Sequence, residues 1–496
     1  MSEVKTDKLS PRTDSGTTTL GDSGDTFLVN TGAKIDINGT ELILDADADT
    51  SITADTDDQI DIRIAGADDF QFTANTFTAL SGSTISIASG AVLSLDDGSV
   101  ATPSLTNTGD LNTGIYFPAA DTVGVTAGGT EQFRFGSNPI PGGSKNLIIN
   151  GAMTVNQRGI SALALDGANQ YTVDRWRVQE ASSAGVIQVN QSSTVPAGAG
   201  FASSLHVDVT TADSSLAAGD YVLIYQSIEA QNLQHLAYGN AAAKSLTLSF
   251  WVRSPKSGTH AVGIYQSDGS RHYIREYTVT SADTWQHITV TFPGDASGTI
   301  NNDAGGGLDV YFGLATGSTY QNTADTWAAA QDWSTSSAVN CVDDAANNFY
   351  LTGVQLEVGD VATDYAHEDY GTTLIKCQRY YEQMEPSGSG YNLPGTYNCF
   401  IATTSTGQGF FQWNVEKRAA PTIDMIAATD WIFVKTSGSN NYSGGEMTAS
   451  AFTFSQIKTN HCWFLITTSS TGGTAGASTW IQSTGANHKV TISAEL

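Results

Sequence analysis

Ser23 lies in the glycine-flanked loop Gly21–Gly24, a setting in which a serine side chain could act as a nucleophile. A nucleophilic serine needs a base within hydrogen-bond reach and an oxyanion hole on a folded scaffold. Asp25 follows the loop where a glycine would be expected, and no histidine precedes His206. We therefore expect no catalysis at this loop.

Asp45, Asp47 and Asp49 have the spacing of the first ligands in a calcium-binding loop. The full loop requires glycine at its sixth position and glutamate at its twelfth. Thr50 and Thr56 occupy those positions here, so the ligand set is incomplete. A solvated turn without a metal ion is the prediction.

His461 and Cys462 are two adjacent potential metal ligands, but no third ligand lies near them in the sequence. The four cysteines are far apart and show no metal-binding spacing. They are Cys341, Cys377, Cys399 and Cys462. This distribution suits reduced thiols better than a disulfide framework, and we expect neither a metal nor a cofactor.

Tryptophan beside polar groups is the arrangement that a glycan site needs, because aromatic rings stack on sugar faces and polar groups bind the hydroxyls. Trp327 and Trp333 are the stronger candidates, since they lie in the long polar segment YQNTADTWAAAQDWSTSS. Trp251 and Arg253 alternate with the apolar residues of LTLSFWVR and point away from them. They could bind a glycan, or cover a neighbouring loop or chain.

Two loops near the C-terminus are also candidate contact surfaces. Residues 437–446 and 469–480 are rich in glycine and serine, and each carries one aromatic residue, Tyr442 and Trp480. Adaptable binding loops use this combination, although flexible loops without a function have it too.

Composition sets limits on the function. A chain of 496 residues is too long for one core, and its 50 glycines and low charged fraction of 15% indicate short strands joined by many turns. The net charge of −28 repels phosphates, so a nucleic-acid-binding role is excluded. The sequence shows neither a membrane span nor a secretory signal, so we expect synthesis in a cytoplasm.

The N-terminal part divides into an arm and a shaft. Residues 1–25 are polar, carry Lys5, Lys8, Pro11 and Arg12, and are predicted to order on a partner. Residues 26–142 repeat short alternating pairs such as Ile60/Ile62, Ile85/Ile87 and Leu93/Leu95. Strands this short cannot offset their ordering entropy alone, so the core must come from stacked repeats or from other chains.

Residues 143–366 contain longer strands with one apolar face each, which predicts two antiparallel sheets packed as a sandwich or jelly roll. In the last strand, from residue 349, Tyr350, Thr352, Val354, Leu356 and Val358 should share one face, with the three aliphatic residues buried. Residues 367–385 are predicted to form a linking helix. The predicted apolar face of this helix comprises Leu374, Cys377, Tyr381 and Met384. Residues 386–496 are predicted to form a C-terminal β-sandwich tip, which makes the protein mainly β and multidomain.

Several segments resemble the tail fibre proteins of tailed bacteriophages, especially marine and cyanobacterial phages. The similar segments include the N-terminal MSEVKTDKLSPRT, DADADTSITADTDDQIDIRIAGADDFQFTANTFTAL, KNLIINGAMTVNQRG with DRW, LTGVQLEVGDVATDYAH followed by CQRYYE, and FFQWNVEKRAAPTI. The resemblance implies a homotrimer whose shaft winds three chains together. It also implies a carbohydrate-binding-module-like jelly roll and an arm attached to a tail adaptor or nozzle protein.

The function that this resemblance implies is host adsorption, in which the distal domains of a virion tail protein bind a bacterial surface glycan or outer-membrane protein. Weak contacts on three tips would add through their high effective concentration. One alternative is a tailspike that cleaves polysaccharide with paired carboxylates. Another is a structural spacer that carries a separate receptor-binding protein.

Overall fold

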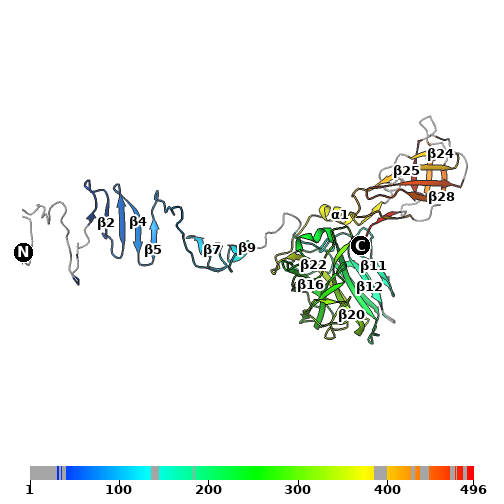
Figure 1. Cartoon of the computed structure of the whole chain (residues 1–496), viewed down its shortest axis with the longest axis horizontal. Helices are drawn as coiled ribbons and strands as arrows, with labels where there is room; N and C mark the ends of the chain where they lie inside the picture. The colour runs from blue at the N-terminus through cyan, green and yellow to red at the C-terminus, as the bar shows by residue number, and fades with distance from the viewer. Residues whose placement is uncertain are drawn as a thin grey trace, which may run out of the picture. The chain divides into compact units, whose positions relative to one another are not determined.

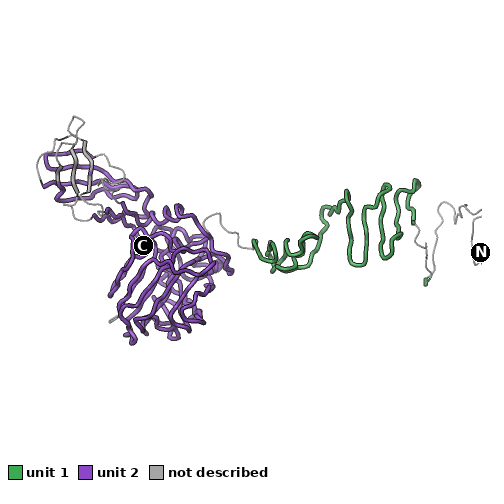
Figure 2. The backbone as a smooth tube through the Cα atoms, turned by 180° about the vertical axis from the view of Figure 1, so that it is seen from behind, with its two compact units in different colours: residues 1–137 green, residues 138–496 purple. Residues whose placement is uncertain are grey.

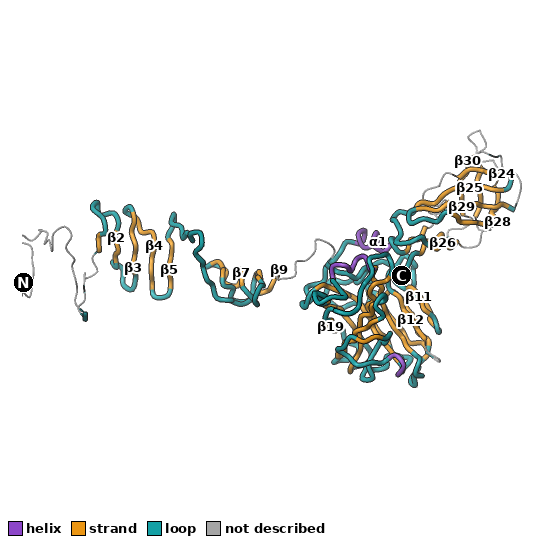
Figure 3. Tube along the Cα trace, viewed as in Figure 1, coloured by secondary structure: helices purple, strands orange, loops and turns teal. Residues whose placement is uncertain are grey.

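The computed structural model describes residues 31–32, 35, 41–135, 145–181, 185–384, 399–425, 431–435, 446–469, 475, 478–483 and 489–496. They belong to two compact units, residues 1–137 and 138–496 (Figure 2). The predicted mainly-β class is confirmed, with strands in both units (Figures 1 and 3). No described helix is both long and apolar enough to cross a membrane. The predicted attachment residues Lys5, Lys8, Pro11 and Arg12 lie outside the described residues, as do Tyr442 and the side chain of Trp480.

Unit 1 contains two small antiparallel sheets whose strands pair with their neighbours in the sequence. The first is formed by β1 (Leu42–Ile43), β2 (Ser51–Thr53), β3 (Ile60–Ile64), β4 (Ala67–Thr73) and β5 (Thr76–Ala79), and the second by β6 (Leu105–Asn107), β7 (Asp110–Tyr116), β8 (Val123–Ala127) and β9 (Thr130–Phe135). The predicted strands at Ile85/Ile87 and Leu93/Leu95 are absent from this described segment. A strand needs a ladder partner, and no neighbouring segment of this chain supplies one there.

Unit 2 begins with a β-sandwich made of two antiparallel sheets. The six-stranded sheet has the order β10 (Leu163–Leu165), β13 (Val186–Ser192), β14 (Ser204–Thr211), β22 (Asn348–Val358), β16 (Leu246–Arg253) and β19 (Gln286–Phe292). The seven-stranded sheet has the order β11 (Asn169–Tyr171), β12 (Arg177–Ala181), β15 (Tyr221–Glu229), β20 (Gly306–Thr316), β17 (Gly258–Gln266), β18 (Arg271–Val279) and β21 (Ala328–Ala329). Their inner faces share one large core, in which Trp176, Phe250 and Phe312 are fully buried.

Strand β22 follows the predicted alternation only as far as Gly353. This glycine has a φ of +61° and lies at a register shift between β16 and β22. The bulge moves the following residues to the opposite face, so Phe349 and Leu351 share the core with Val354 and Leu356. The prediction that Tyr350 and Thr352 share a face with Val354 is therefore wrong. Val354 and Leu356 are buried as predicted, and Val358 is half-buried.

The C-terminal part of unit 2 starts with α1 (Tyr370–Gln378), which Asp369 caps by accepting a hydrogen bond from the Thr372 amide. The helix is shorter than predicted, because Tyr381 and Met384 lie in strand β23 (Tyr381–Met384). This strand forms a three-stranded sheet with β31 (Val490–Ser493) and β26 (Thr422–Met425).

The C-terminal module was predicted as a sandwich, but its other strands close into a barrel. The order is β24 (Cys399–Thr403), β25 (Thr406–Gln412), β29 (His461–Thr468), β28 (Glu446–Ser455), β27 (Trp431–Lys435) and β30 (Ser478–Ser483). Closure occurs because β30 pairs with both β27 and β24, which removes both sheet edges. All four cysteines are buried, and none of them forms a disulfide among the described residues.

The chain terminus joins the barrel part of unit 2 to its sandwich. Glu495 forms ion pairs with Arg175 and, at 3.0 Å, with Arg158. The Arg175 guanidinium lies 3.5 Å from the centre of the Tyr380 ring. Arg379 makes two hydrogen bonds of 2.7 and 2.9 Å to the buried Glu229. These charge-assisted contacts hold the start of the barrel module against the sandwich.

Candidate glycan-binding face

The outer face of the seven-stranded sheet carries a second apolar cluster, separate from the core between the sheets. Its buried members are Leu223, Ala261, Ile274, Tyr311 and Trp333. Four partly buried tyrosines, Tyr221, Tyr225, Tyr265 and Tyr320, surround them, and we call the whole surface the tyrosine face.

Alternation along the strands produces this face. In β15, Val222 and Ile224 point into the sandwich core, so Tyr221, Leu223 and Tyr225 point outward. The register then places Tyr225 beside Tyr311 of β20. Polar-tipped aromatic rings from neighbouring strands therefore form one surface.

The segment from Ser318 to Ala338 packs against this face and supplies Trp333. The Trp333 ring lies edge-on to Tyr311, with centroids 5.1 Å apart, and to Tyr265 at 6.0 Å. Gly263 makes room for the cluster, because a Cβ at that position would lie 2.1 Å from the Tyr311 hydroxyl. Trp333 is only 9% exposed, and its indole Nε1 donates to no group among the described residues.

Polar groups lie directly beside the tyrosine rings. The Arg177 guanidinium carbon is 5.2 Å from the centre of the Tyr171 ring and 5.5 Å from that of Tyr225. Gln179 donates a hydrogen bond of 2.6 Å to the Tyr221 hydroxyl. The Arg177 Nε has no hydrogen-bond partner among the described residues. The face thus combines aromatic surfaces with donors and acceptors suited to sugar hydroxyls.

Asp309 of β20 is an acidic residue on this face, and its cross-strand partners are Ser227 and Tyr265. Its carboxylate accepts a hydrogen bond from the Ser227 hydroxyl. Burial raises the pKa of Asp309 to about 6, and the hydrogen bond from Ser227 and the nearby Arg177 and Arg175 oppose this rise.

This raised pKa predicts a pH-dependent stability. Below about pH 4 the Asp309 carboxyl is protonated in both the folded and the unfolded state. As pH rises from about 4 to 6, the unfolded state loses this proton first, so the contribution of Asp309 to the free energy of unfolding falls, and the loss is complete above about pH 6. Asp309→Asn should raise the free energy of unfolding at about pH 7.5 by about 1–3 kcal/mol and leave it nearly unchanged at about pH 4. Denaturant unfolding at both pH values measures this. Asp283→Asn, at a side chain that is 60% exposed, is the control. Identical pH profiles for the two variants would contradict the prediction.

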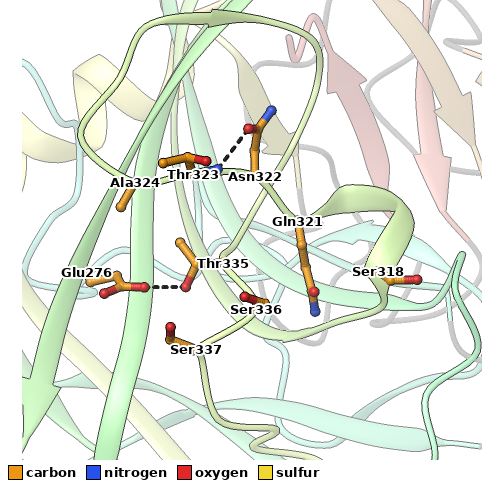
Figure 4. Close-up of a pocket in the computed structure, with 9 residues that line it drawn as sticks. All are labelled: Glu276, Ser318, Gln321, Asn322, Thr323, Ala324, Thr335, Ser336 and Ser337. Atoms are coloured by element: carbon orange, nitrogen blue, oxygen red, sulfur yellow. Dashed lines mark hydrogen bonds between the residues drawn. The ribbon is translucent and has the colours of Figure 1, made fainter.

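A polar pocket of about 530 Å³ adjoins the face (Figure 4). Glu276 of β18 lies on one side, and its carboxylate accepts a hydrogen bond of 2.5 Å from the Thr335 hydroxyl. The other lining residues come from the two arms of the 318–338 segment, which pair through Gln321 and Ser334. They are Ser318, Gln321, Asn322, Thr323, Ala324, Ser336 and Ser337. Hydroxyl, amide and carboxylate groups therefore converge on one space that could hold a hydrated or polyhydroxylated ligand.

Comparison with known proteins gives structural neighbours only. No protein-family model matches the chain, and no curated protein matches its sequence. Among solved structures, it is similar to the enzymatically active domain of tailspike protein 4 of bacteriophage CBA120, with 12% identity, a TM-score of 0.24, and coverage of 43% of this chain and 21% of that one. A CBM4 structure matches with 18% identity and a TM-score of 0.23, covering 42% of this chain and 97% of that chain. The structure of TmCBM61 in complex with β-1,4-galactotriose matches with 12% identity and a TM-score of 0.22, covering 43% of this chain and 99% of its own.

These TM-scores are all below 0.5, so the description of the fold rests on the strand pairing itself. The chain spans about a fifth of the tailspike structure that it matches.

The predicted site residues of the central module lie in three different places. Trp333 belongs to the tyrosine face. Trp327 instead packs against the core between the sheets, where its ring lies 5.3 Å from that of Tyr273 and its Nε1 donates to the Pro293 carbonyl. Trp251 and Arg253 lie on the outer side of the other sheet. Their roles in binding stay predictions.

Sequence reasoning missed most of the tyrosine face. Tyr221 and Tyr225 are four residues apart in one strand, a spacing that places two side chains on the same face. This signal was present in the sequence. Arg177 and Gln179 show the same alternation in β12, but only the sheet order brings them beside the tyrosines.

Proposed function

We propose that this chain is a tail fibre protein of a tailed bacteriophage. It forms a homotrimer in the virion tail, attaches through its N-terminal arm to an adaptor or nozzle protein, and binds a host-surface glycan without cleaving it. The tyrosine face is the proposed glycan site. The proposal combines the sequence resemblance with the features of the two units described below.

The observation that supports glycan binding is the composition of the tyrosine face. Four tyrosines, partly accessible and arranged around a rigid apolar cluster, offer ring surfaces for stacking. Arg177 and Gln179 lie within reach of ligand hydroxyls at the same surface.

The separation between two of the acids at this surface supports binding without cleavage. Asp309 and Glu276 lie on strands separated by β17, and the register places Glu276 four residues beyond the row of Asp309. Strand geometry separates their Cα atoms by about 16 Å. Glycoside hydrolysis usually needs two carboxyl groups within about 5–9.5 Å of each other.

Unit 1 has large apolar side chains that are exposed in the single chain. Their exposure supports the proposal of an oligomer. Phe133 and Phe135 are 66% and 63% exposed, and Leu93 and Leu111 are each 64% exposed. A monomer with this much apolar surface would be prone to association. Further copies of the same chain, wound together, would cover it.

A variant of unit 1 tests the trimer. Light scattering on the purified protein should give the mass of three chains, and the double substitution Phe133→Asp/Phe135→Asp should give the mass of one. Both residues are exposed in the single chain, so the charges should disrupt association without disturbing a core. Gln132→Asp, at an exposed polar residue of the same strand, is the control and should stay trimeric. A wild-type mass of one chain would contradict the proposal.

Competition for adsorption tests the function directly. Purified full-length protein should lower the rate at which the phage adsorbs to its host, and it should release no reducing ends from the host polysaccharide. Release of reducing ends would favour a polysaccharide-cleaving tailspike. Failure to compete would favour a spacer that carries a separate receptor-binding protein.

A further inference from the structure

The outer face of the six-stranded sheet carries a line of aromatic side chains that the proposed site does not use. We call it the aromatic strip, and it consists of Phe201, His206, Trp251, Trp285, His287 and Tyr350. The strip lies on the opposite side of the sandwich from the tyrosine face, because the core residues of both sheets point between them.

Strand register builds one end of the strip. Asn190, His206, Tyr350 and Arg253 are successive cross-strand partners on β13, β14, β22 and β16. This row spans about 14 Å across the sheet. His206 stacks on Tyr350 with ring centres 4.3 Å apart, and the Arg253 guanidinium carbon is 5.2 Å from the centre of the Tyr350 ring.

The bulge at Gly353 builds the other end. A Cβ on this glycine would lie 2.6 Å from Phe201 Cζ and 3.1 Å from Trp251 Cδ1, so both rings lie directly against the backbone. Trp251 also contacts His287, with ring centres 5.2 Å apart. Only glycine allows two aromatic side chains to approach the strand this closely in its left-handed conformation.

The strip leads into a pocket of about 220 Å³ at the end of the sandwich. Phe201 is shared by both, and its ring lies 5.0 Å from that of Tyr365 and 5.2 Å from that of His367. Thr154, Glu368 and other polar residues complete the lining. The pocket thus continues the pattern of aromatic rings beside hydrogen-bonding groups.

Two donors along the strip lack acceptors. Arg253 Nε and the Trp285 indole Nε1 have no hydrogen-bond partner among the described residues. Both side chains adjoin Tyr350. Both nitrogens are shielded from solvent, so a ligand on the strip would contact the rings and the exposed polar groups rather than these two donors.

We propose that the aromatic strip is a second carbohydrate-binding surface and takes an extended chain of neutral sugars that ends in the Tyr365 pocket. This inference rests on the proposed function in so far as the module recognises glycans. Aromatic rings and amide side chains suit the two faces and the hydroxyls of sugars. The net charge of −28 disfavours acidic polysaccharides.

A second copy of the chain fits the strip less well than a glycan. The large apolar side chains that are strongly exposed lie in three places: in unit 1, on the barrel, and at Val361, Tyr370 and Ile375 of unit 2. None of them belongs to the described strands of the sandwich. The buried centre of a contact between copies is more apolar than the general surface. The strip instead mixes rings with Asn190, Arg253 and histidines.

Affinity electrophoresis of the full-length protein tests this proposal. The gels contain mixed-linkage β-glucan, xylan, galactan or galactomannan as neutral probes, and polygalacturonate or alginate as acidic ones. Four forms are compared: wild type, a face variant (Tyr221→Ala/Tyr225→Ala), a strip variant (Trp251→Ala/Trp285→Ala), and the combination of both pairs. Trp463→Ala, at a barrel tryptophan that is 40% exposed, is the control.

The wild type and the control should be retarded by at least one neutral polysaccharide and by neither acidic one. The face variant should keep part of this retardation, the strip variant should lose about tenfold in affinity, and the combined variant should lose all of it. A strip variant that behaves like wild type overturns the proposal, as does stronger retardation by an acidic probe. If only the strip variant loses binding, the strip is supported and the tyrosine face is wrong. A wild type that binds no neutral probe contradicts both sites.

Two further measurements test the strip. The first needs no substitution, so misfolding of a variant does not affect it, and the second asks whether another copy of the chain occupies the strip. Hydroxyl-radical footprinting of the wild type with the retarding polysaccharide should show protection of Trp251, Trp285 and Tyr350, and a lack of protection overturns the proposal without any substitution. A change in oligomeric mass of the strip variant, measured by light scattering, would instead identify the strip as a contact between copies.

Discussion

Replacing Glu382 with alanine should lower the free energy of unfolding by about 3–5 kcal/mol, because it leaves a charge buried without its partner. Lys417 Nζ lies 2.6 Å from Glu382 Oε2, and both side chains are fully buried. Nζ also donates to the carbonyls of Gln378 and Val415, and Asn414 donates to the Glu382 carboxylate. Burial lowers the pKa of Lys417, and Glu382 opposes that shift.

Denaturant unfolding of the full-length protein measures this effect, and two controls interpret it. Glu368→Ala breaks the half-exposed pair with Lys376, so it should cost no more than about 1 kcal/mol. The double variant Glu382→Leu/Lys417→Met removes both charges and should recover most of the loss, because apolar residues of similar volume often replace a buried pair without cost. A loss below about 1 kcal/mol for Glu382→Ala would show that the pair is not desolvated as the structure has it.

Removing two rings from the tyrosine face should weaken glycan binding by about a hundredfold. Tyr221→Ala/Tyr225→Ala deletes the stacking surfaces, and residues of this kind each contribute about 1–2 kcal/mol or more at the centre of a binding site. The double variant should then fail to compete with the phage for adsorption at concentrations where the wild type does. Circular dichroism should show an intact fold, since both side chains lie outside the main core.

Two controls separate stacking from other effects. Tyr221→Phe/Tyr225→Phe keeps the rings and removes the hydroxyls, including the acceptor for Gln179, and should weaken binding by less than about tenfold. Tyr370→Ala removes a ring that is 58% exposed on α1 and should have no effect. If Tyr370→Ala abolishes competition while the face variant does not, the glycan site lies elsewhere in the chain.

Charged side chains connect the sandwich to the barrel module. Glu382 and Lys417 lie where β23 meets the barrel, and Arg379 and Glu495 tie the same region to the sandwich. Because the contacts are charge-assisted and buried, they fix the geometry as well as contribute stability. These contacts therefore hold the start of the barrel module against the sandwich that carries the tyrosine face.

The sequence alone determined the fold class and much of the core. Leu246, Leu248, Phe250 and Val252 occupy every second position of their strand and are all fully buried, because the two-residue period of a strand is a local property. Leu308, Val310, Phe312 and Leu314 follow the same rule. The short strand at Ile60 and Ile62 in unit 1 also follows from local alternation, whereas Ile85/Ile87 and Leu93/Leu95 alternate without forming strands.

The tertiary structure decided which residues form the candidate sites. Alternation shows that Tyr225, Arg177 and Tyr311 point away from a core, but only the order β12, β15, β20 brings them together. The bulge at Gly353 reversed the faces of β22, and β30 closed the barrel through pairs with strands far away in the sequence. Periodicity predicts on which face of its own strand each side chain lies, whereas register, bulges and sheet order depend on contacts between distant segments.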